Sequence, residues 1–401
     1  MKQHILILGA GFSGMWSALS AARLLDKNNR SDISISVVAP QAELRVRPRF
    51  YEPEVHTMKA SLDELFAAVD VNFIKGSAQT IDTTNKRISY NDSQGQPNHV
   101  TYDRLILATG SSVARPALPG VDQFAFDVDQ IEQAAKLESH IKALAKQPDS
   151  AARNTVVVAG GGFTGIETAT EMPERLRAAL GNDAKIRVII VDRGQQIGAA
   201  LGENISPIIA QATSELGVEW LLGTAVTGID ADGVTLSDGQ RIETKTVVWT
   251  VGVRASSLTE QIAGERDNQG RLHVDSNLKV IGQGDVFATG DVAYATTDDQ
   301  GNYALMTCQH AIALGRSAGN NAAASLLDVA PIPYRQEKYV TCLDLGQWGA
   351  VYTEGWDRQV KLVKDEGKQL KTQINTQWIY PPVADRATAL AAADPLIPVV
   401  A

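Results

Sequence analysis

The feature that most constrains this chain is a strand, a glycine-rich turn and a helix in immediate succession near its start. Residues 5–8 form an apolar run of strand length, the turn occupies residues 9–14, and an Ala- and Leu-rich segment follows. One glycine permits the tight bend, the next lets main-chain N–H groups approach a pyrophosphate, and the third lets the helix lie close to the strand. The positive helix end then faces the phosphates. The pattern predicts a dinucleotide site at Gly9, Gly11, Phe12, Ser13 and Gly14.

The same succession returns in the middle of the chain. Residues 155–159 are apolar after Thr155, residues 160–167 carry a second glycine turn, and a helical segment continues to about residue 180. A second copy of the pattern in the same context predicts a second dinucleotide site. We expect its turn residues to be Gly160, Gly162, Phe163, Thr164 and Gly165.

The two turns differ in the residue that ends the strand after each of them. After the second turn, the strand at residues 186–191 ends in Asp192, whose carboxylate suits the 2′-hydroxyl of NADH and disfavours the 2′-phosphate of NADPH. The neighbouring Arg193 could receive that phosphate, so NADPH stays open as the second choice. After the first turn the strand ends in Ala39 and Pro40, and no acid is available there for a ribose contact.

Two dinucleotide turns in one chain indicate two bound dinucleotides. The economical interpretation is a flavin on the first turn and a nicotinamide on the second, which implies hydride transfer. The composition agrees with a folded multi-domain protein, since 44% of the 401 residues are hydrophobic and 21% are charged. A net charge of −9 without a long basic run predicts no nucleic-acid partner.

The cysteines and histidines point to no metal. Cys308 and Cys342 lie too far apart in sequence for a C-x-x-C pair, and the six histidines form no H-E-x-x-H motif. No signal peptide opens the chain, and no apolar run approaches 18 residues. We therefore expect a cytoplasmic protein with no metal site.

Three further segments complete a known pattern, at residues 105–110, 247–252 and 286–293. In this order around two glycine turns, they resemble the two-dinucleotide-binding-domain flavoprotein superfamily. The resemblance implies FAD as the flavin, with Asp291 bonded to its ribityl chain. It adds Thr109, Gly110 and Gly290 to the FAD site and Gly252 to the NADH site.

Within this superfamily, the chain resembles the type II NADH:quinone oxidoreductase branch over about residues 1–380. The matches are residues 47–52, the turn at 160–167, and the helix start Cys308-Gln309-His310-Ala311. The resemblance adds Arg47 to the FAD site and places Gln309 beside both FAD and a quinone. Alanine is usual where this chain has Cys308, so Cys308 is either a residue of the acceptor pocket or a small packing residue.

Two charged residues are further catalytic candidates. Glu167 follows the second turn, and we expect it in the first turn of the helix. The resemblance implies that it acts in nicotinamide binding and proton handling, while the alternative is a carboxylate that complements the helix dipole. Lys371 is matched to a lysine near the quinone path, although Lys368 competes for that match.

The C-terminal part has a different texture. Short strand-like runs follow residue 331, and Leu370, Ile374 and Trp378 recur every four residues, which predicts one face of a short helix. The last 19 residues are rich in alanine, with two aspartates and one arginine, which makes them a poor membrane anchor. Weak peripheral association with the inner membrane face and packing within the protein or a dimer both stay open.

These observations predict an α/β chain with two Rossmann-like dinucleotide-binding domains and a small C-terminal α+β domain. We expect the FAD domain at residues 1–119 and 267–330, the NAD(P)H domain at 120–266, and a cap that supports a homodimer or faces a membrane at 331–401. The expected activity is hydride transfer from NADH to FAD and two-electron transfer to a quinone. The alternatives are a reductase with a soluble acceptor such as a ferredoxin-like protein, a sulfide:quinone oxidoreductase that uses the two cysteines, and a non-catalytic FAD- and NAD-binding sensor.

Overall fold

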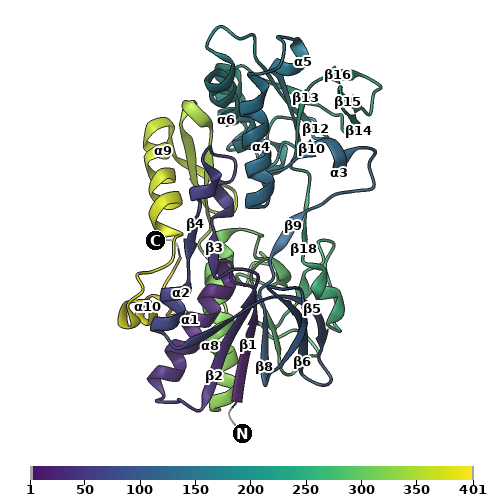
Figure 1. The fold of residues 1–401 in the computed structure, drawn as a ribbon. Helices are drawn as coiled ribbons and strands as arrows, with labels where there is room; N and C mark the ends of the chain where they lie inside the picture. The colour runs from purple at the N-terminus through teal and green to yellow at the C-terminus, as the bar shows by residue number, and fades with distance from the viewer. Residues whose placement is uncertain (1–2, 400–401) are drawn as a thin grey trace.

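A seven-stranded sheet forms the lower half of the molecule in Figure 1, and the computed structural model describes residues 3–399. The apolar run of residues 5–8 belongs to an interior strand of this sheet, β1 (Gln3–Leu8), and it is fully buried. This strand pairs in parallel with β2 on one side and with β8 on the other. The strand order is β20 (Val286–Ala288), β8 (Arg104–Leu107), β1 (Gln3–Leu8), β2 (Ile33–Ala39), β5 (Val71–Asp82), β6 (Arg87–Asp92) and β7 (Pro97–Thr101).

Helices α1 (Phe12–Lys27) and α8 (Cys308–Leu327) lie against each other beside this sheet (Figure 1). Their backbones come unusually close because α8 carries glycine at the crossing. A Cβ atom on Gly319 would overlap the main-chain oxygen of Ser17, and one on Gly315 would lie 2.5 Å from the main-chain oxygen of Ser13. The Ser17 hydroxyl also donates to the Gly315 carbonyl at 3.1 Å. The segment that carries α8 is therefore packed directly against the helix of the first glycine turn.

A second parallel sheet forms the upper half. Its order is β10 (Ala125–Phe126), β17 (Thr246–Trp249), β11 (Thr155–Ala159), β12 (Arg187–Asp192) and β13 (Val218–Leu222). Helices α4 (Ile131–Leu144), α6 (Phe163–Leu180) and α7 (Ser206–Leu216) accompany it, together with a small antiparallel sheet of β14 (Val226–Asp230), β15 (Gly233–Leu236) and β16 (Arg241–Glu243). The two halves thus repeat one strand–turn–helix arrangement.

Two antiparallel strands connect the halves, β9 (Ser111–Val113) and β18 (Val253–Ala255). Directly after β18, the chain already contacts the lower sheet, because the Gln261 side chain accepts from the Ile81 N–H at 2.8 Å and donates to the Gln79 carbonyl at 3.0 Å. These bonds attach Gln261 to strand β5 of the lower sheet. The predicted domain boundaries stay predictions.

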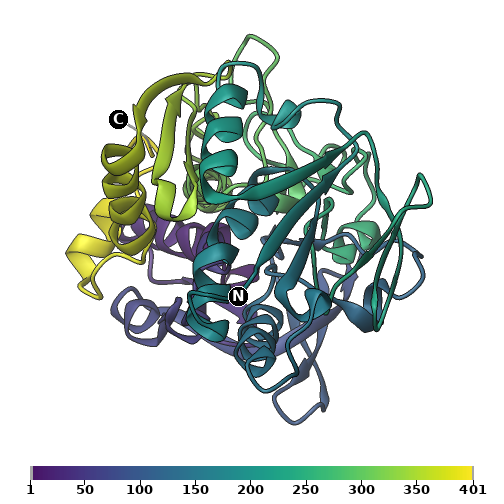
Figure 2. The same cartoon turned by 90° about the horizontal axis from the view of Figure 1, so that it is seen from above.

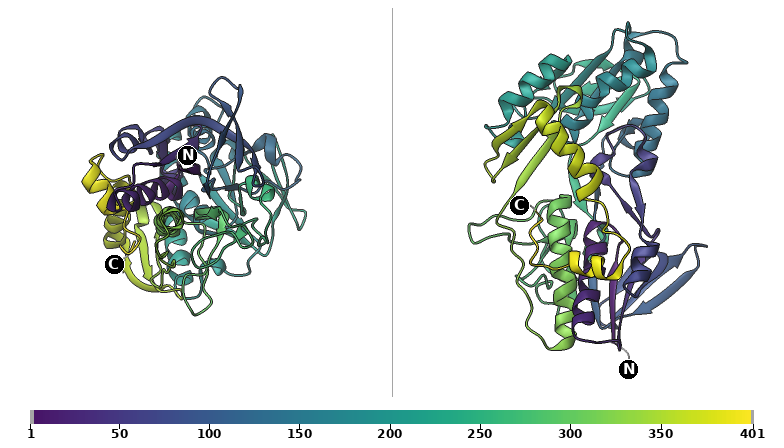
Figure 3. Two further views of the ribbon diagram at one scale, coloured as in Figure 1. Left: turned by 90° about the horizontal axis from the view of Figure 1, so that it is seen from below. Right: turned by 90° about the vertical axis from the view of Figure 1, so that its left-hand side faces the viewer.

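The C-terminal region adds the predicted α+β element. Strands β22 (Val340–Asp344), β23 (Ala350–Glu354) and β24 (Gln359–Val363) form an antiparallel sheet, followed by α9 (Lys364–Gln373), a π-helical turn (Ile374–Trp378) and α10 (Arg386–Ala392). This region, coloured olive to yellow, lies alongside the helices of the upper domain in Figure 2 and alongside both domains in Figure 3. The predicted fold class is confirmed.

The inward face of α9 differs from the predicted one. Gly367, Lys371 and Asn375 are the buried positions, whereas Leu370 and Ile374 are half-buried and the Trp378 side chain is 57% exposed. The apolar spacing failed to identify this face because its central buried residue, Lys371, is charged and has a buried partner, as described below. Between residues 3 and 399, no helix is both long enough and apolar enough to cross a membrane.

Shorter elements complete the chain. They are β3 (Glu43–Arg45), β4 (Lys59–Ser61), α2 (Asp63–Ala68), α3 (Val121–Phe124), α5 (Ala151–Asn154), β19 (Leu272–His273) and β21 (Ala293–Tyr294), with 3₁₀ turns at Arg47–Arg49, Val55–Thr57, Ala199–Leu201, Ser257–Gln261, Gly290–Val292 and Gly346–Trp348.

The crossing of α1 and α8 generates a stability prediction. Gly319→Ala should lower the free energy of unfolding by about 1–3 kcal/mol, because the added methyl overlaps backbone that cannot move aside cheaply. Gly284→Ala is the matched control, since a Cβ there meets no described atom within 4 Å, and it should change stability by less than about 0.5 kcal/mol. Denaturant unfolding of both variants checks this, and equal stability would contradict the assigned crossing.

Candidate functional site

The first glycine turn packs closely against the main chain around it. Gly9 has a φ of +108°, and a Cβ on it would overlap the main-chain oxygen of Ala108 at the end of β8. A Cβ on Gly14 would overlap the Gly9 carbonyl oxygen. Glycine is required at both positions by the protein itself, because a side chain would push the turn away from the sheet.

No contact within the described protein requires glycine at position 11. Its φ of −70° and ψ of −167° suit any residue, and a Cβ on it would meet nothing within 4 Å in the described chain. The position is exposed at the N-terminus of α1, where unpaired N–H groups face outward. Glycine at this point fits a ligand that lies directly against the backbone, as the pyrophosphate of a dinucleotide does.

The second turn repeats this division of roles. Gly160 has a φ of +105°, and a Cβ on Gly165 would overlap the Gly160 carbonyl oxygen. Gly162 has a φ of −78° and a ψ of −174°, with nothing described within 4 Å of an added Cβ. Asp192 at the end of β12 accepts from the Gly161 N–H at 2.6 Å and from the Gly194 N–H at 2.7 Å, so its carboxylate lies beside the turn.

The first site has further features that fit a flavin dinucleotide. The hydroxyls of Thr109 and Thr289, just beyond the adjacent strands β8 and β20, are buried without a hydrogen-bond partner in the described chain. Asp291 accepts from the Ser111 hydroxyl at 2.7 Å, and the Arg47 guanidinium lies 3.4 Å from the same oxygen. Buried polar groups without partners cost stability unless a ligand satisfies them. The residues present therefore fit a dinucleotide with polar groups along its length.

The predicted turn residues are brought together as expected. A Cβ on Gly290 would lie 2.5 Å from the Ser13 hydroxyl oxygen, so the 3₁₀ turn that carries Asp291 lies on the first glycine turn. Phe12 and Phe163 begin their helices and are partly buried, whereas the Thr164 side chain is exposed. Gly110 (φ of +67°) and Gly252 (φ of +72°) flank the connecting strands.

A buried ion pair lies where the upper domain meets the C-terminal region. The Lys371 ammonium donates to Glu167 Oε1 at 2.7 Å and to the Cys342 carbonyl at 2.9 Å. The same Glu167 oxygen accepts from the Asp344 N–H at 3.1 Å. Only 6% of the Glu167 side chain and 7% of the Lys371 side chain are exposed. Of the two candidate lysines, it is therefore Lys371 that meets Glu167.

The protonation of this pair is set by its burial. Burial raises the pKa of Glu167 to about 7, although the Lys371 charge opposes that shift. Burial by itself lowers the pKa of Lys371, but Glu167, Cys342 and Asp344 together outweigh it and the net shift is upward. Glu167 was expected in the first helical turn, yet α6 begins at Phe163 and Glu167 is its fifth residue. The helix dipole acts mainly within the first turn, so it does not account for this carboxylate.

Gln309 connects the start of α8 to the C-terminal region. Its side chain donates to the Val340 carbonyl at 2.9 Å and accepts from the Gln336 side chain at 3.0 Å. Cys308 precedes it, and both cysteines are free thiols. Burial raises the pKa of Cys308 to about 11 and that of Cys342 to about 12. Both sulfurs are therefore protonated at neutral pH.

Sequence reasoning missed the residues that surround the ion pair. The Asp344 carboxylate accepts from the Lys368 ammonium at 2.6 Å and from the Tyr51 hydroxyl at 3.2 Å. Tyr51 stood inside the matched segment at 47–52, and Lys368 was a competitor for Lys371. Asp344 carried no signal, because one aspartate after a strand resembles any turn residue.

Comparison with known proteins agrees with this geometry. The family model described as pyridine nucleotide-disulphide oxidoreductase matches residues 3–315. An NADH dehydrogenase-like protein of Mycobacterium tuberculosis is 42% identical over 399 residues, which cover 98% of each chain. The type II NADH:quinone oxidoreductase of the same organism is 29% identical over 321 residues, covering 73% of this chain and 67% of the relative. The structure of NDH2 from Plasmodium falciparum in complex with NADH has a TM-score of 0.79 at 16% identity and covers 98% of both chains.

The family match covers more than half of the chain, and the first relative matches almost all of it. The resemblance to the type II NADH:quinone oxidoreductase branch is confirmed. The two glycine turns, each with one open glycine, are the structural counterpart of these matches. The chain belongs to the pyridine nucleotide-disulphide oxidoreductase family and is an NAD(P)H-dependent flavin oxidoreductase.

Proposed function

We propose that this protein is an NADH:quinone oxidoreductase that uses FAD and pumps no protons. One arrangement carries the proposal. Each of two separate parallel sheets has a glycine turn with one glycine, Gly11 or Gly162, that no described atom crowds, and a buried Glu167–Lys371 pair lies between the second turn and the C-terminal region. The relative named as a type II NADH:quinone oxidoreductase supports the quinone as acceptor.

Each cofactor has its proposed residues. Gly11, Arg47, Thr109 and Asp291 would hold FAD, and the open Gly162 with Asp192 would hold NADH. FAD supplies the hydride acceptor and the two-electron donor when it is bound. The protein contributes by orienting FAD and NADH toward each other and by excluding water from the space between them.

Glu167 and Lys371 are proposed to act on protons and on the acceptor. A carboxyl with a pKa near 7 can hold and release a proton at neutral pH, which is the property required where a quinone oxygen becomes protonated. Lys371 keeps this carboxyl in place and supplies positive charge next to the developing quinol oxygen. Gln309 orients the edge of the acceptor pocket through its bonds to Val340 and Gln336.

Homodimer formation, cytoplasmic location and weak association with a membrane surface belong to the same proposal. The exposed Trp378, Val383 and Leu396 favour a shallow surface contact. Thr372 and Gln373 of α9 and Thr376 of the following π-helical turn form a polar side, which argues against deep insertion.

An anaerobic titration tests the proposed function. A slight excess of NADH should bleach the flavin absorbance, and a short-chain quinone should restore it at once. Bleaching without recovery would replace the quinone by a soluble acceptor. A stable bleached complex that reduces no acceptor would indicate a sensor. Bleaching by sulfide instead of NADH would indicate a sulfide oxidoreductase, against which the protonated state of both thiols speaks.

The open glycines generate a paired prediction. Gly11→Val should abolish flavin binding while the fold survives, because the side chain would occupy ligand space and touch no described atom. Gly162→Val should retain the flavin and weaken NADH binding at least about tenfold, equivalent to about 1.4 kcal/mol. Flavin content and NADH titration of the two purified proteins check this. Loss of both ligands from either variant would contradict separate sites.

The coenzyme preference generates another pair. Asp192→Ala should raise the KM for NADH about tenfold, because a charge-assisted hydrogen bond to the ribose is lost. It should also reduce the preference for NADH over NADPH. Arg193→Ala is the matched variant, and it should leave NADH use unchanged while weakening NADPH use. If the KM values for NADH and NADPH changed by the same factor in each of the two variants, a ribose contact at the Asp192 carboxylate would be refuted.

The ion pair predicts a pH dependence. Turnover with quinone should fall as the pH rises through about 7, because Glu167 then loses the proton it donates. Lys371 lowers the pKa of Glu167, so Lys371→Met should move this fall to higher pH by about one unit or more. Lys371→Arg retains the charge and should keep the fall near its original pH. The measurement is kcat with quinone against pH, and an unmoved profile in Lys371→Met would exclude Glu167 as the titrating group.

A further inference from the structure

The Glu167–Lys371 pair is sealed from solvent, and the proposed reaction still needs a proton from outside. Conversion of NADH and a quinone to NAD⁺ and a quinol breaks one C–H bond of the nicotinamide and delivers a hydride. The two quinol O–H groups contain that hydrogen and one proton taken from water. Since both side chains of the pair are at most 7% exposed, that proton has to reach Glu167 through the protein.

Asp344 contacts the pair and also contacts a partly exposed lysine. Its main-chain N–H donates to Glu167 Oε1, and its carboxylate lies near enough that its charge raises the pKa of Glu167. That carboxylate is itself only 6% exposed. Its Oδ1 accepts from the Lys368 ammonium and from the Gly346 N–H at 2.9 Å, and its Oδ2 accepts from the Tyr51 hydroxyl. Asp344 is therefore held in one position from three directions.

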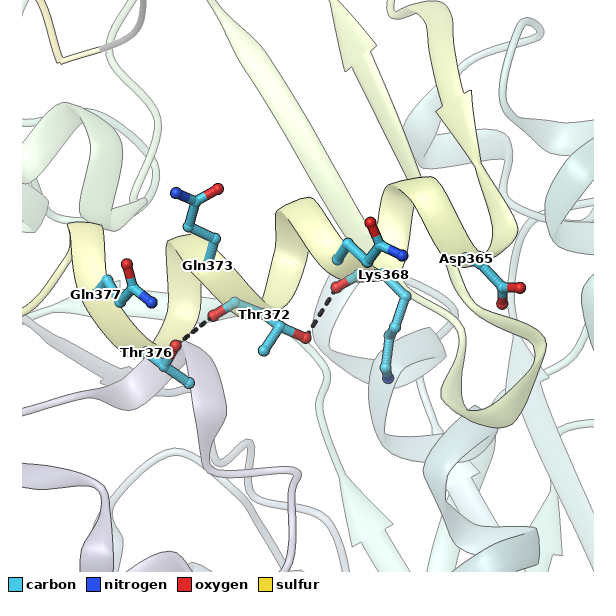
Figure 4. Close-up of a pocket in the computed structure, with 7 residues that line it drawn as sticks. Asp365, Lys368, Thr372, Gln373, Thr376 and Gln377 are labelled. Carbon is cyan, nitrogen blue, oxygen red and sulfur yellow. Dashed lines mark hydrogen bonds between the residues drawn. The ribbon is translucent and has the colours of Figure 1, made fainter.

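Lys368 connects the buried Asp344 carboxylate with the protein surface. Its side chain is 38% exposed, and it lies one helical turn from Lys371 on α9. Figure 4 shows Lys368 with Asp365, Thr372 and Gln373 of α9 and Thr376 of the following π-helical turn, which line a surface groove. The Lys368 side chain is partly open to solvent along this groove, and its ammonium bonds the buried carboxylate.

We propose that Lys368 and Asp344 form the route by which solvent protons reach Glu167. When Glu167 has given its proton to the quinone oxygen, the Lys368 ammonium passes a proton to the Asp344 carboxylate, Asp344 passes that proton to Glu167, and water reprotonates the Lys368 amine. One proton enters for each quinol formed, and no protein group is oxidised or reduced. The inference rests on the proposed function and adds two residues to its mechanism.

The charges around the route favour a mobile proton. Glu171 on α6 faces Lys368 and Asp344, and burial raises its pKa to about 7. Burial and the nearby carboxylates raise the pKa of Tyr51, so its hydroxyl stays a donor to Asp344. The Asp344 charge also raises the pKa of Glu167, and the neutral Cys342 thiol completes the surroundings.

The test compares a proton-requiring acceptor with one that needs no proton. In flavin-loaded Asp344→Asn, which keeps the side-chain size, turnover with a short-chain quinone should fall at least about tenfold. Turnover with ferricyanide, which takes electrons alone, and the rate of anaerobic bleaching by NADH should stay within about twofold. A small diffusible acid such as imidazolium should partly restore the quinone rate. Equal losses with both acceptors, or no loss with quinone, would overturn the route.

Surface variants separate the route from general charge effects. Lys368→Gln should lower the quinone rate about two- to fivefold and leave ferricyanide turnover unchanged, because water can replace a surface group more easily than a buried one. Lys361→Gln is the matched control, a half-exposed lysine on β24 outside the network, and it should change neither rate. Equal effects of the two lysine variants would contradict a specific route through Lys368.

A last measurement needs no quinone. Below pH 7 the Glu167 carboxyl should carry a proton, because its pKa is raised to about 7, and exchange of that proton for deuterium is to be followed in the carboxyl infrared band, assigned by its absence in Glu167→Gln. Asp344→Asn should slow that exchange. Normal exchange in Asp344→Asn would overturn the route even if the wild-type protein reduced no quinone. Failure of wild-type quinone reduction, with slowed exchange in the variant, would overturn the proposed acceptor alone.

Discussion

The structure depends on backbone that approaches backbone around α1. In the turn before this helix, Gly9 lies against the main chain at the end of β8. Gly14, in the first turn of the helix, lies against the Gly9 carbonyl oxygen. The far side of the same turn and helix meets α8 at Gly315 and Gly319. A side chain at any of these points would separate the sheet, the helix and the returning part of the chain. The position of the open Gly11, and hence of the proposed flavin, follows from these contacts.

The second organising feature is the junction around Glu167. It combines α6 of the upper domain, β22 and α9 of the C-terminal region, and the segment with Tyr51 from the lower domain. Burial of a carboxylate and an ammonium is unfavourable unless each is paired and hydrogen-bonded, and the pair meets both conditions. A charged contact between separate regions is a stringent constraint on how they assemble. It also provides a group that titrates near neutral pH where hydride, electrons and protons would meet.

Much of the fold could be predicted because the glycine turns are local. Residues 5–8 and 155–159 are apolar and lead directly into their turns, so strand, turn and helix could be predicted from adjacent residues. Asp192 could be predicted as well, since its distance from the second turn is set by one helix and one strand. The boundary at 266 stays a prediction, since the chain returns through the short strand β18. Such a strand has little sequence signal of its own.

The sequence by itself determined two dinucleotide turns, the α/β class and the identity of most residues along the proposed cofactors, because each follows from contacts between neighbours in the chain. Only the tertiary structure decided between Lys371 and Lys368, placed Glu167 beyond the first turn of α6, and brought Asp344 and Tyr51 to them. Those residues lie up to 320 positions apart, as from Tyr51 to Lys371. Their meeting depends on how three regions pack, and the burial that raises the pKa of Glu167 exists only after they have packed.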